Sequence, residues 1–354
     1  MKINITTVKQ YLFRHPRLNL IQYIIRKILP SADACREMLD IEKNPLVVKY
    51  RHYGELNRGI VIYHIYFGTK DERKIGYCCM LKHTLLHLAY ADRFGFVPVV
   101  EWTKAVPYTE KNAVNGKYNG FEYFMENSST IELDEVLKSD LVVRSKIHDR
   151  FLFFDCNMSS TGSYDVGEHE IEIMSEMFKK YIKFNETGMR EILNPASELL
   201  SKGKCLGVHV RGTDFNNNFN GHPKAISVEK YISQVETIFS ENRYQYIFLA
   251  TDEVQTVEEF REKFGEKLLY YDVLRSENGD SIHYEAVSVR HNNKYYLGME
   301  ILKDVYTLGN CYGLVAGFSN VSIIARVIKR STSLQYEDEI IMNEGFNSNF
   351  RLFS

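Results

Sequence analysis

LGVHVRGTDF, residues 206–215, has the pattern of a buried β-strand that ends in polar side chains. Its apolar positions, Leu206, Val208 and Val210, are followed at once by Arg-Gly-Thr-Asp at residues 211–214. Short apolar runs bounded in this way are typical of the strands of parallel α/β sheets. Such sheets bind ligands at the carboxyl ends of their strands, so this stretch predicts both an α/β fold and the place of a site.

His209 and Arg211 alternate with the valines and therefore share one face of the predicted strand. Arginine is always charged, and its planar fork of donors matches a phosphate group. Arg211 at the end of a buried strand therefore indicates a bound anion, or else an ion pair with a carboxylate such as that of Asp214. The strand alone favours neither interpretation.

Strand and helix patterns alternate along the chain, which predicts doubly wound parallel sheets. In the first half, strands at 59–67 and 96–102 flank a helix at 81–93, with a turn at 76–83 before it. Further strands are expected at 151–156, 204–210, 246–251, 267–273 and 312–317, and helices at 168–184, 227–240, 254–264, 296–308 and 321–329.

The domain organisation follows from length and from one break in this pattern. At 354 residues the chain is long for a single core and suits two domains. Asn194-Pro195 interrupts the periodicity, so we expect an N-terminal α/β domain at 1–195, a C-terminal Rossmann-like domain at 196–330 and a tail at 331–354.

Charge and cysteine content limit the partners and the compartment. Lys and Arg number 44 against 46 Asp and Glu, so no overall positive field favours nucleic acid. The six cysteines show neither the spacing of a zinc site nor a disulfide framework. With no signal-peptide pattern and no long apolar run, the chain is expected to be cytoplasmic.

Residues 9–29 form a basic amphipathic segment, with apolar side chains at helical spacing and no acidic residue. A helix of this kind can lie on an anionic membrane, which would place the protein at the inner face of the membrane. A helix packed on its own domain is the alternative.

Polar side chains follow three of the predicted strands. The sets are His209, Arg211 and Asp214, then Thr251 and Asp252, then Ser319, Asn320 and Ser322. Because parallel strands end at the same edge of a sheet, we expect the three sets to converge. An arginine and a helix N-terminus would neutralise a diphosphate, and a carboxylate can accept two hydrogen bonds from guanine.

Other chemistries lack their motifs. The sequence contains neither GxxxxGK[ST] nor GxGxxG, which disfavours P-loop and dinucleotide sites. HExxH and GxSxG are absent as well, and no Asp-x-Asp pair of the kind that holds a metal-bound nucleotide sugar is found.

Several motifs occur in an order that resembles the fucosyltransferase superfamily, which includes α-1,6-fucosyltransferases and the rhizobial nodulation fucosyltransferase. The motifs are GYCCMLKH, HVRGTD, GHPK with SVEKYI, FLATDE, DVYTLGN and GFSNVS. The resemblance covers about half of the chain. It implies a GT-B-like fold, in which two Rossmann-like domains face a cleft, and an inverting, metal-independent transfer from GDP-fucose.

The resemblance also implies roles for individual residues. Arg211 would hold the β-phosphate, whose charge grows as GDP departs, and Asp214 would orient Arg211 or face the sugar. His209 and Asp252 would contact guanine. The remaining donor-binding residues would be Ser319, Asn320 and Ser322 at a helix start and Gly76 and His83 in the first domain.

Two positions depart from the family pattern. Gly212 replaces the second arginine of the HVRRTD motif, which weakens the case for GDP-fucose as the donor. The Asn-rich loop lacks the acid that α-1,6-fucosyltransferases carry as a base, and Asp214, Asp155 and Glu101 are the alternatives.

The sequence therefore predicts a glycosyltransferase that moves a sugar, foremost L-fucose from GDP-fucose, onto a surface polysaccharide or a lipid-linked oligosaccharide. One alternative is a GT-B enzyme with another nucleotide sugar. Another is a non-catalytic nucleotide- or glycan-binding protein. No cofactor is expected besides the donor substrate.

Overall fold

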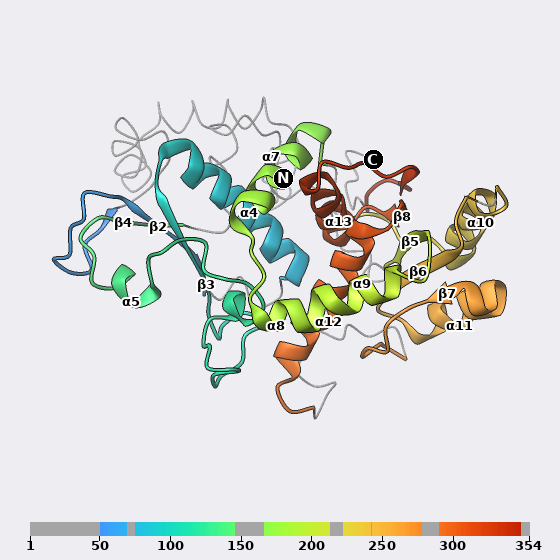
Figure 1. The fold of residues 1–354 in the computed structure, drawn as a ribbon, viewed down its shortest axis with the longest axis horizontal. Helices are drawn as coiled ribbons and strands as arrows, with labels where there is room; N and C mark the ends of the chain where they lie inside the picture. The colour runs from blue at the N-terminus through green and yellow to red at the C-terminus, as the bar shows by residue number, and fades with distance from the viewer. Residues whose placement is uncertain are drawn as a thin grey trace, which may run out of the picture.

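β5, Cys205–Val210, is the central strand of a five-stranded sheet, and all its residues are buried. The computed structural model describes residues 50–68, 75–145, 166–212, 222–241, 243–277 and 290–347. These ranges contain two sheets, which lie at the left and the right of Figure 1.

The sheet around β5 is parallel throughout and has the order β7-β6-β5-β8-β9. Its other strands are β6 (Tyr246–Thr251), β7 (Leu268–Leu269), β8 (Gly313–Gly317) and β9 (Glu339–Met342). The chain adds strands on one side of β5 and then returns to the other side. This reversal between β5 and β8 is the switch point at which doubly wound sheets bind ligands.

Helices cover both faces of this sheet. Leu206, Val208 and Val210 share a buried cluster with residues of α10 (Val228–Phe239) and α11 (Val254–Phe264). The opposite face carries α12 (Asn293–Asn310) and α13 (Asn320–Ser331). A Cβ built on Gly207 would lie 3.1 Å from Leu308 Cδ2, so the glycine lets α12 approach β5 closely.

The first sheet has the order β1-β4-β2-β3. β2 (Ile62–Phe67) pairs in parallel with β3 (Val97–Trp102) and β4 (Val142–Arg144), and the two-residue β1 (Tyr50–Arg51) is antiparallel to β4. α4 (Tyr77–Phe94) connects β2 to β3 and ends at Gly95, whose φ of 67° suits glycine. The predicted α/β class is confirmed: the second sheet is parallel throughout, and the first is parallel except for the short β1.

α4 begins four residues before the helix predicted at 81–93. Tyr77, Met80 and Leu81 are buried at i, i+3 and i+4, so the first turn already has an inward-facing apolar stripe. Gly76, Cys78 and Cys79 are small residues that suggested a turn in the sequence. Most of the predicted turn at 76–83 is helix.

The chain does not break at Asn194-Pro195. α8 (Glu186–Gly188), a π-helical turn (Met189–Leu193) and α9 (Asn194–Leu200) follow one another directly. Pro195 lies near the start of α9 but directly follows helical residues, and the wider π turn before it accommodates both its ring and its missing N–H. The domain boundary expected here therefore lies within helical structure.

One buried cluster joins the two sheets. It contains Tyr63 of β2, Trp102 of β3, Leu302 of α12 and Leu314 of β8. The tail predicted at 331–354 is corrected in part, because its residues Glu339–Met342 form β9 and extend the second sheet.

Several predictions lie outside the described residues: the segment at 9–29, the strand at 151–156, Asp155, Asp214 and the Asn-rich loop. Among the helices that the structure describes, none has the length and apolar character needed to cross a membrane.

Candidate functional site

A cavity of about 290 Å³ lies between the carboxyl edge of the second sheet and the start of α4. Five of the predicted site residues line it: Gly76, His209, Arg211, Asp252 and Asn320. Convergence of the three strand ends is thus observed, and the first sheet contributes the opposite wall through residues 75–79.

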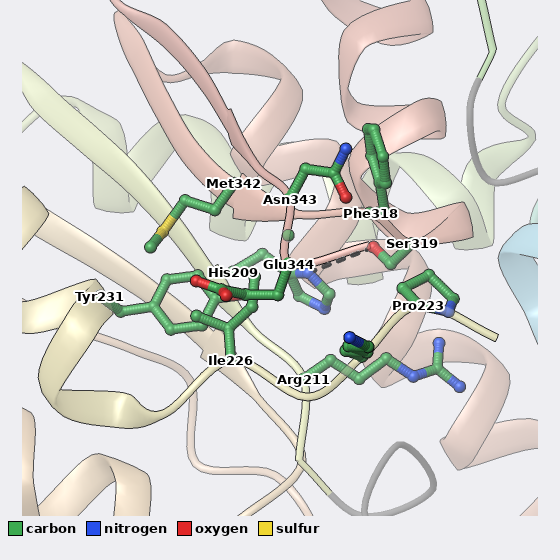
Figure 2. A pocket seen from close by; sticks show the side chains of 12 residues that line it. His209, Arg211, Pro223, Ile226, Tyr231, Phe318, Ser319, Met342, Asn343 and Glu344 are labelled. Atoms are coloured by element: carbon green, nitrogen blue, oxygen red, sulfur yellow. Dashed lines mark hydrogen bonds between the residues drawn. The ribbon is translucent and has the colours of Figure 1, made fainter. Parts of the chain in front are cut away.

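His209 and Arg211 leave β5 at its carboxyl end. Figure 2 shows the His209 ring directed at Ser319, with the Arg211 side chain extended beside Pro223. The ring is 7% exposed, and its Nδ1 lies 3.4 Å from Ser319 Oγ. Both side chains also line a smaller pocket behind the cavity.

Arg211 and the start of α4 line the same cavity. Burial raises the pKa of the Cys78 and Cys79 thiols, while the nearby guanidinium acts on both in the opposite sense. An arginine that faces a helix start across a cavity brings two positive sources to one place, which favours an anion between them.

The hydroxyls of Ser319 and Ser322 form a capping box at the start of α13. Ser319 Oγ accepts a hydrogen bond from Ser322 N at 3.0 Å, and Ser319 N donates to Ser322 Oγ at 3.1 Å. Both residues are almost fully buried. Their role in ligand binding stays a prediction, because capping already engages both hydroxyls.

Asn320, the first residue of α13, lines the cavity. Its Oδ1 is buried and has no hydrogen-bond partner among the described residues. A buried amide oxygen without a partner is costly in a folded protein, so this atom is available to accept a hydrogen bond from a water or a ligand in the cavity.

Asp252 follows β6 and holds the neighbouring strand end. Its Oδ1 accepts a hydrogen bond from Gly212 N at 3.1 Å. A Cβ built on Gly212 would lie 1.9 Å from Cδ of Glu253. The glycine at the position of the motif's second arginine therefore makes room for the Glu253 carboxylate.

Asp304 and Glu300 are cavity residues that the sequence prediction missed. Together with Leu297 and Ile301 they form one face of α12, and all four line the cavity. Burial raises the pKa of Asp304 to about 7, although the charges of Arg275 and Lys303 oppose this shift. Asp304 Oδ1 has no hydrogen-bond partner in the described part of the chain.

These acids did carry a sequence signal. Glu300 and Asp304 occupy the i+3 and i+7 positions of an apolar helical stripe that starts at Leu297. Acids on the inward face of a helix are unusual unless they are paired, as Glu300 is with Arg290, or a site requires them.

His222 is a further cavity residue, and backbone hydrogen bonds to the C-terminal segment fix its position. Lys224 N donates to Gly345 O at 2.9 Å, and Asn347 N donates to His222 O at 2.8 Å. Phe346 stacks on Phe318 with ring centroids 5.9 Å apart. This part of the predicted tail therefore fixes the edge of the site.

His83 does not reach the cavity. It lies within α4 and is 3% exposed, and it is absent from the residues that line either pocket. Within the described ranges, no group of three or more His, Cys, Asp or Glu side chains is arranged to hold a metal ion.

Residues 167–337 match the family model of α-(1,6)-fucosyltransferase N- and catalytic domains. No curated protein matches the chain. Among solved structures, NodZ α-1,6-fucosyltransferase soaked with GDP-fucose is 16% identical, covers 76% of this chain and 92% of its own, and gives a TM-score of 0.42. NodZ from Bradyrhizobium is 15% identical, with the same coverage and a TM-score of 0.43.

POFUT1 in complex with GDP is 11% identical over 81% of this chain and 99% of its own, with a TM-score of 0.38. The family match begins at α7 (Glu168–Tyr181) and ends two residues before β9, so it includes the whole cavity wall of the second sheet. It confirms the predicted resemblance to the fucosyltransferase superfamily and identifies the chain as an enzyme of the glycosyltransferase class.

Proposed function

We propose that this chain transfers L-fucose from GDP-fucose to a glycan acceptor, with inversion and without a metal ion. The observation that carries the proposal is the cavity itself, which brings Arg211, the start of α13 and the carboxylates of Asp252 and Asp304 together. Cations and helix N-termini suit the diphosphate, and carboxylates suit the amide and amino edge of guanine.

Arg211 is the proposed catalytic residue of the described chain. When the bond between fucose and GDP breaks, negative charge grows on the β-phosphate oxygen. A fixed guanidinium stabilises that charge more in the transition state than in the ground state, which lowers the barrier. Asp214 is proposed to orient Arg211 or to face the sugar.

Asp252 and Asp304 are the two candidates for the carboxylate that accepts hydrogen bonds from guanine. The resemblance assigns it to Asp252, but Asp252 Oδ1 already accepts a hydrogen bond from Gly212 N. Asp304 Oδ1 is buried without a partner in the described chain. We therefore propose that Asp304 shares or takes this role. Calorimetry with GDP and ADP on Asp252→Asn and Asp304→Asn separates the two, because the variant of the guanine reader loses its preference for GDP.

The reaction class is tested by offering the protein a panel of nucleotide sugars and identifying the released sugar by mass spectrometry. Hydrolysis of GDP-fucose, in which water replaces the acceptor and fucose and GDP are released, is expected, with no hydrolysis of UDP- or ADP-sugars. Equal release from all donors contradicts guanine selection, and no release from any donor contradicts the enzyme assignment.

A different GDP-sugar or nucleotide sugar is the second candidate, and Glu253 favours it. This carboxylate occupies the space that a side chain at position 212 would fill, so one phosphate-binding charge of the family motif has no counterpart here. The same donor panel distinguishes the two, because the alternative predicts release of another sugar.

The acceptor is proposed to be a growing surface polysaccharide or a lipid-linked oligosaccharide. A lipid-linked acceptor would explain the basic segment at 9–29 as a contact with the cytoplasmic face of the membrane. Sedimentation with vesicles that contain anionic lipid tests this location. Equal sedimentation of the full chain and of a chain without residues 1–30 would contradict it.

A further inference from the structure

α12 lines the cavity with one face and packs against residues of the first sheet with another. Its face formed by Leu297, Glu300, Ile301 and Asp304 lines the cavity. Other side chains of the same helix pack against the first unit, by which we mean the described residues between 50 and 145, and Figure 1 shows α12 running between the two sheets. The position of this helix therefore sets the position of the cavity's acidic wall.

The start of α12 has no cap from its own residues. Asn292, the N-cap residue, has a φ of 52° and makes no side-chain capping bond. Instead, Glu110 Oε1 accepts hydrogen bonds from Lys294 N at 2.7 Å and from Tyr295 N at 3.2 Å. These are the second and third residues of the helix, whose N–H groups an N-cap side chain normally satisfies.

Glu110 is itself held by the first unit. Its backbone N donates to Tyr123 Oη at 3.0 Å. The preceding residue, Thr109, donates from Oγ1 to Trp102 O at 3.1 Å, at the end of β3. The cap is thus anchored to the carboxyl edge of the first sheet.

Aromatic packing reinforces the same attachment. The Tyr295 ring lies 5.5 Å from that of Tyr123 and 5.0 Å from that of Phe124, measured between centroids. A Cβ built on Gly298 would lie 3.2 Å from Tyr77 Cε2, so the first unit contacts the helix closely one turn later. These contacts lie in the same turns of α12 as the cavity residues Leu297 and Glu300.

From this geometry we infer that Glu110 is a positioning residue for the nucleotide site. Its carboxylate fixes the start of α12, and α12 in turn holds Glu300 and Asp304 at the cavity wall. The inference rests on the proposed function for the identity of the ligand, a guanosine diphosphate. It adds that residues 50–145, which would bind the acceptor, help to position the donor wall through the Glu110 carboxylate as well as through aromatic packing.

The test compares Glu110→Ala and Glu110→Gln with Lys111→Ala, an exposed neighbour, in the full chain and well below the thermal midpoint of each protein. Hydrogen exchange of the α12 amides reports the cap, and calorimetry with GDP reports the cavity. Glu110→Ala is expected to speed exchange at Lys294 and Tyr295 and to raise the Kd for GDP about tenfold. Glu110→Gln, whose amide oxygen still accepts, is expected to recover most of the affinity, and Lys111→Ala to behave as the wild type.

Faster exchange in Glu110→Ala with an unchanged Kd would overturn the inference, because the cap would then be purely structural. Unchanged exchange at Lys294 and Tyr295 in Glu110→Ala would show that Glu110 does not cap α12. A wild-type chain that fails to bind GDP would overturn the proposed function first, and the exchange data would still show whether Glu110 holds α12.

Discussion

The backbone amide of Gly212 donates a hydrogen bond to the Asp252 carboxylate at 3.1 Å, which ties the end of β5 to the end of β6. Glu253, the next residue, fills the space beside Gly212 with its carboxylate. The ends of β5 and β6 therefore contact each other through Gly212, Asp252 and Glu253 at the edge of the cavity. A glycine at position 212 leaves the space that the Glu253 carboxylate fills, which gives a packing reason for the departure from the family motif.

Gly212→Ala is expected to destabilise the protein by roughly 1 kcal/mol, because the new methyl group displaces the half-buried Glu253 carboxylate. The backbone at Gly212 does not have a positive φ, so alanine itself is tolerated there. In a Glu253→Ala background the same change is therefore expected to be neutral or slightly stabilising.

Urea denaturation of the wild type, both single variants and the double variant measures this coupling as a difference in free energies of unfolding. Additive effects of the two substitutions would show that Glu253 does not determine the residue at 212.

Arg211→Ala is expected to weaken GDP binding about tenfold to a hundredfold, since one charge-assisted contact to phosphate is lost. Turnover with the active donor should fall further, by about 10² to 10³, because the transition state carries more charge on the phosphate. Calorimetry and a sugar-release assay measure the two effects. Arg261→Ala, on the outer surface of α11, is the matched control, and an Arg211→Ala enzyme with normal turnover would remove Arg211 from the mechanism.

The central part of the fold could be predicted because parallel strands carry strong local signals. β5, β6 and β8 are short buried apolar runs, and polar residues follow each of them. Convergence of their ends needs no knowledge of side-chain contacts, since all strands of a parallel sheet end at one edge. His209, Arg211, Asp252 and Asn320 were found at the cavity for this reason, whereas Gly76 was implied by the family resemblance.

Other features depend on contacts between distant residues. The cap on α12 comes from Glu110, which is 184 positions away from Lys294. β9 is a short edge strand of partly buried residues, so neither alternation nor a long apolar run marks it. Pro195 is a common sign of a break, but here the π-helical turn at Met189–Leu193 accommodates the proline and the helix continues.

Ser319→Ala is expected to lower the free energy of unfolding by about 1 kcal/mol, because the capping box of α13 loses its main acceptor. Ser227, the N-cap residue of α10, makes no such backbone bond and provides the matched control. Chemical denaturation of Ser319→Ala and Ser227→Ala compares the two caps. Equal small losses would mean that the capping box adds no stability.

Asp304 should make GDP binding depend on pH. Burial raises the pKa of its carboxyl to about 7 in the empty cavity. Guanine donors require the ionised carboxylate, so binding below this pH must release a proton. Affinity for GDP is therefore expected to be constant above about pH 7.5 and to fall by up to about tenfold for each pH unit below 7.

The same pKa predicts an effect on stability with a defined sign. An unfolded aspartate has a pKa of about 3.9, so between pH 4 and 7 the native state holds the proton more tightly and stability falls as the pH rises. At pH 8 the buried charge opposes folding, and Asp304→Asn should melt at a higher temperature than the wild type. This advantage should shrink toward pH 4, while the variant binds GDP at least tenfold more weakly at pH 8 and without the pH dependence.

Thermal melts and calorimetry from pH 5 to 8 check both effects, with Asp272→Asn as the control because Asp272 is exposed. A wild-type affinity that is constant from pH 6 to 8 would mean that the Asp304 carboxyl does not contact the nucleotide. A variant that gains stability and keeps its affinity would leave Asp304 as a buried charge without a part in binding. Gain of stability with loss of affinity is the result expected of a carboxylate that is kept in the cavity for its ligand.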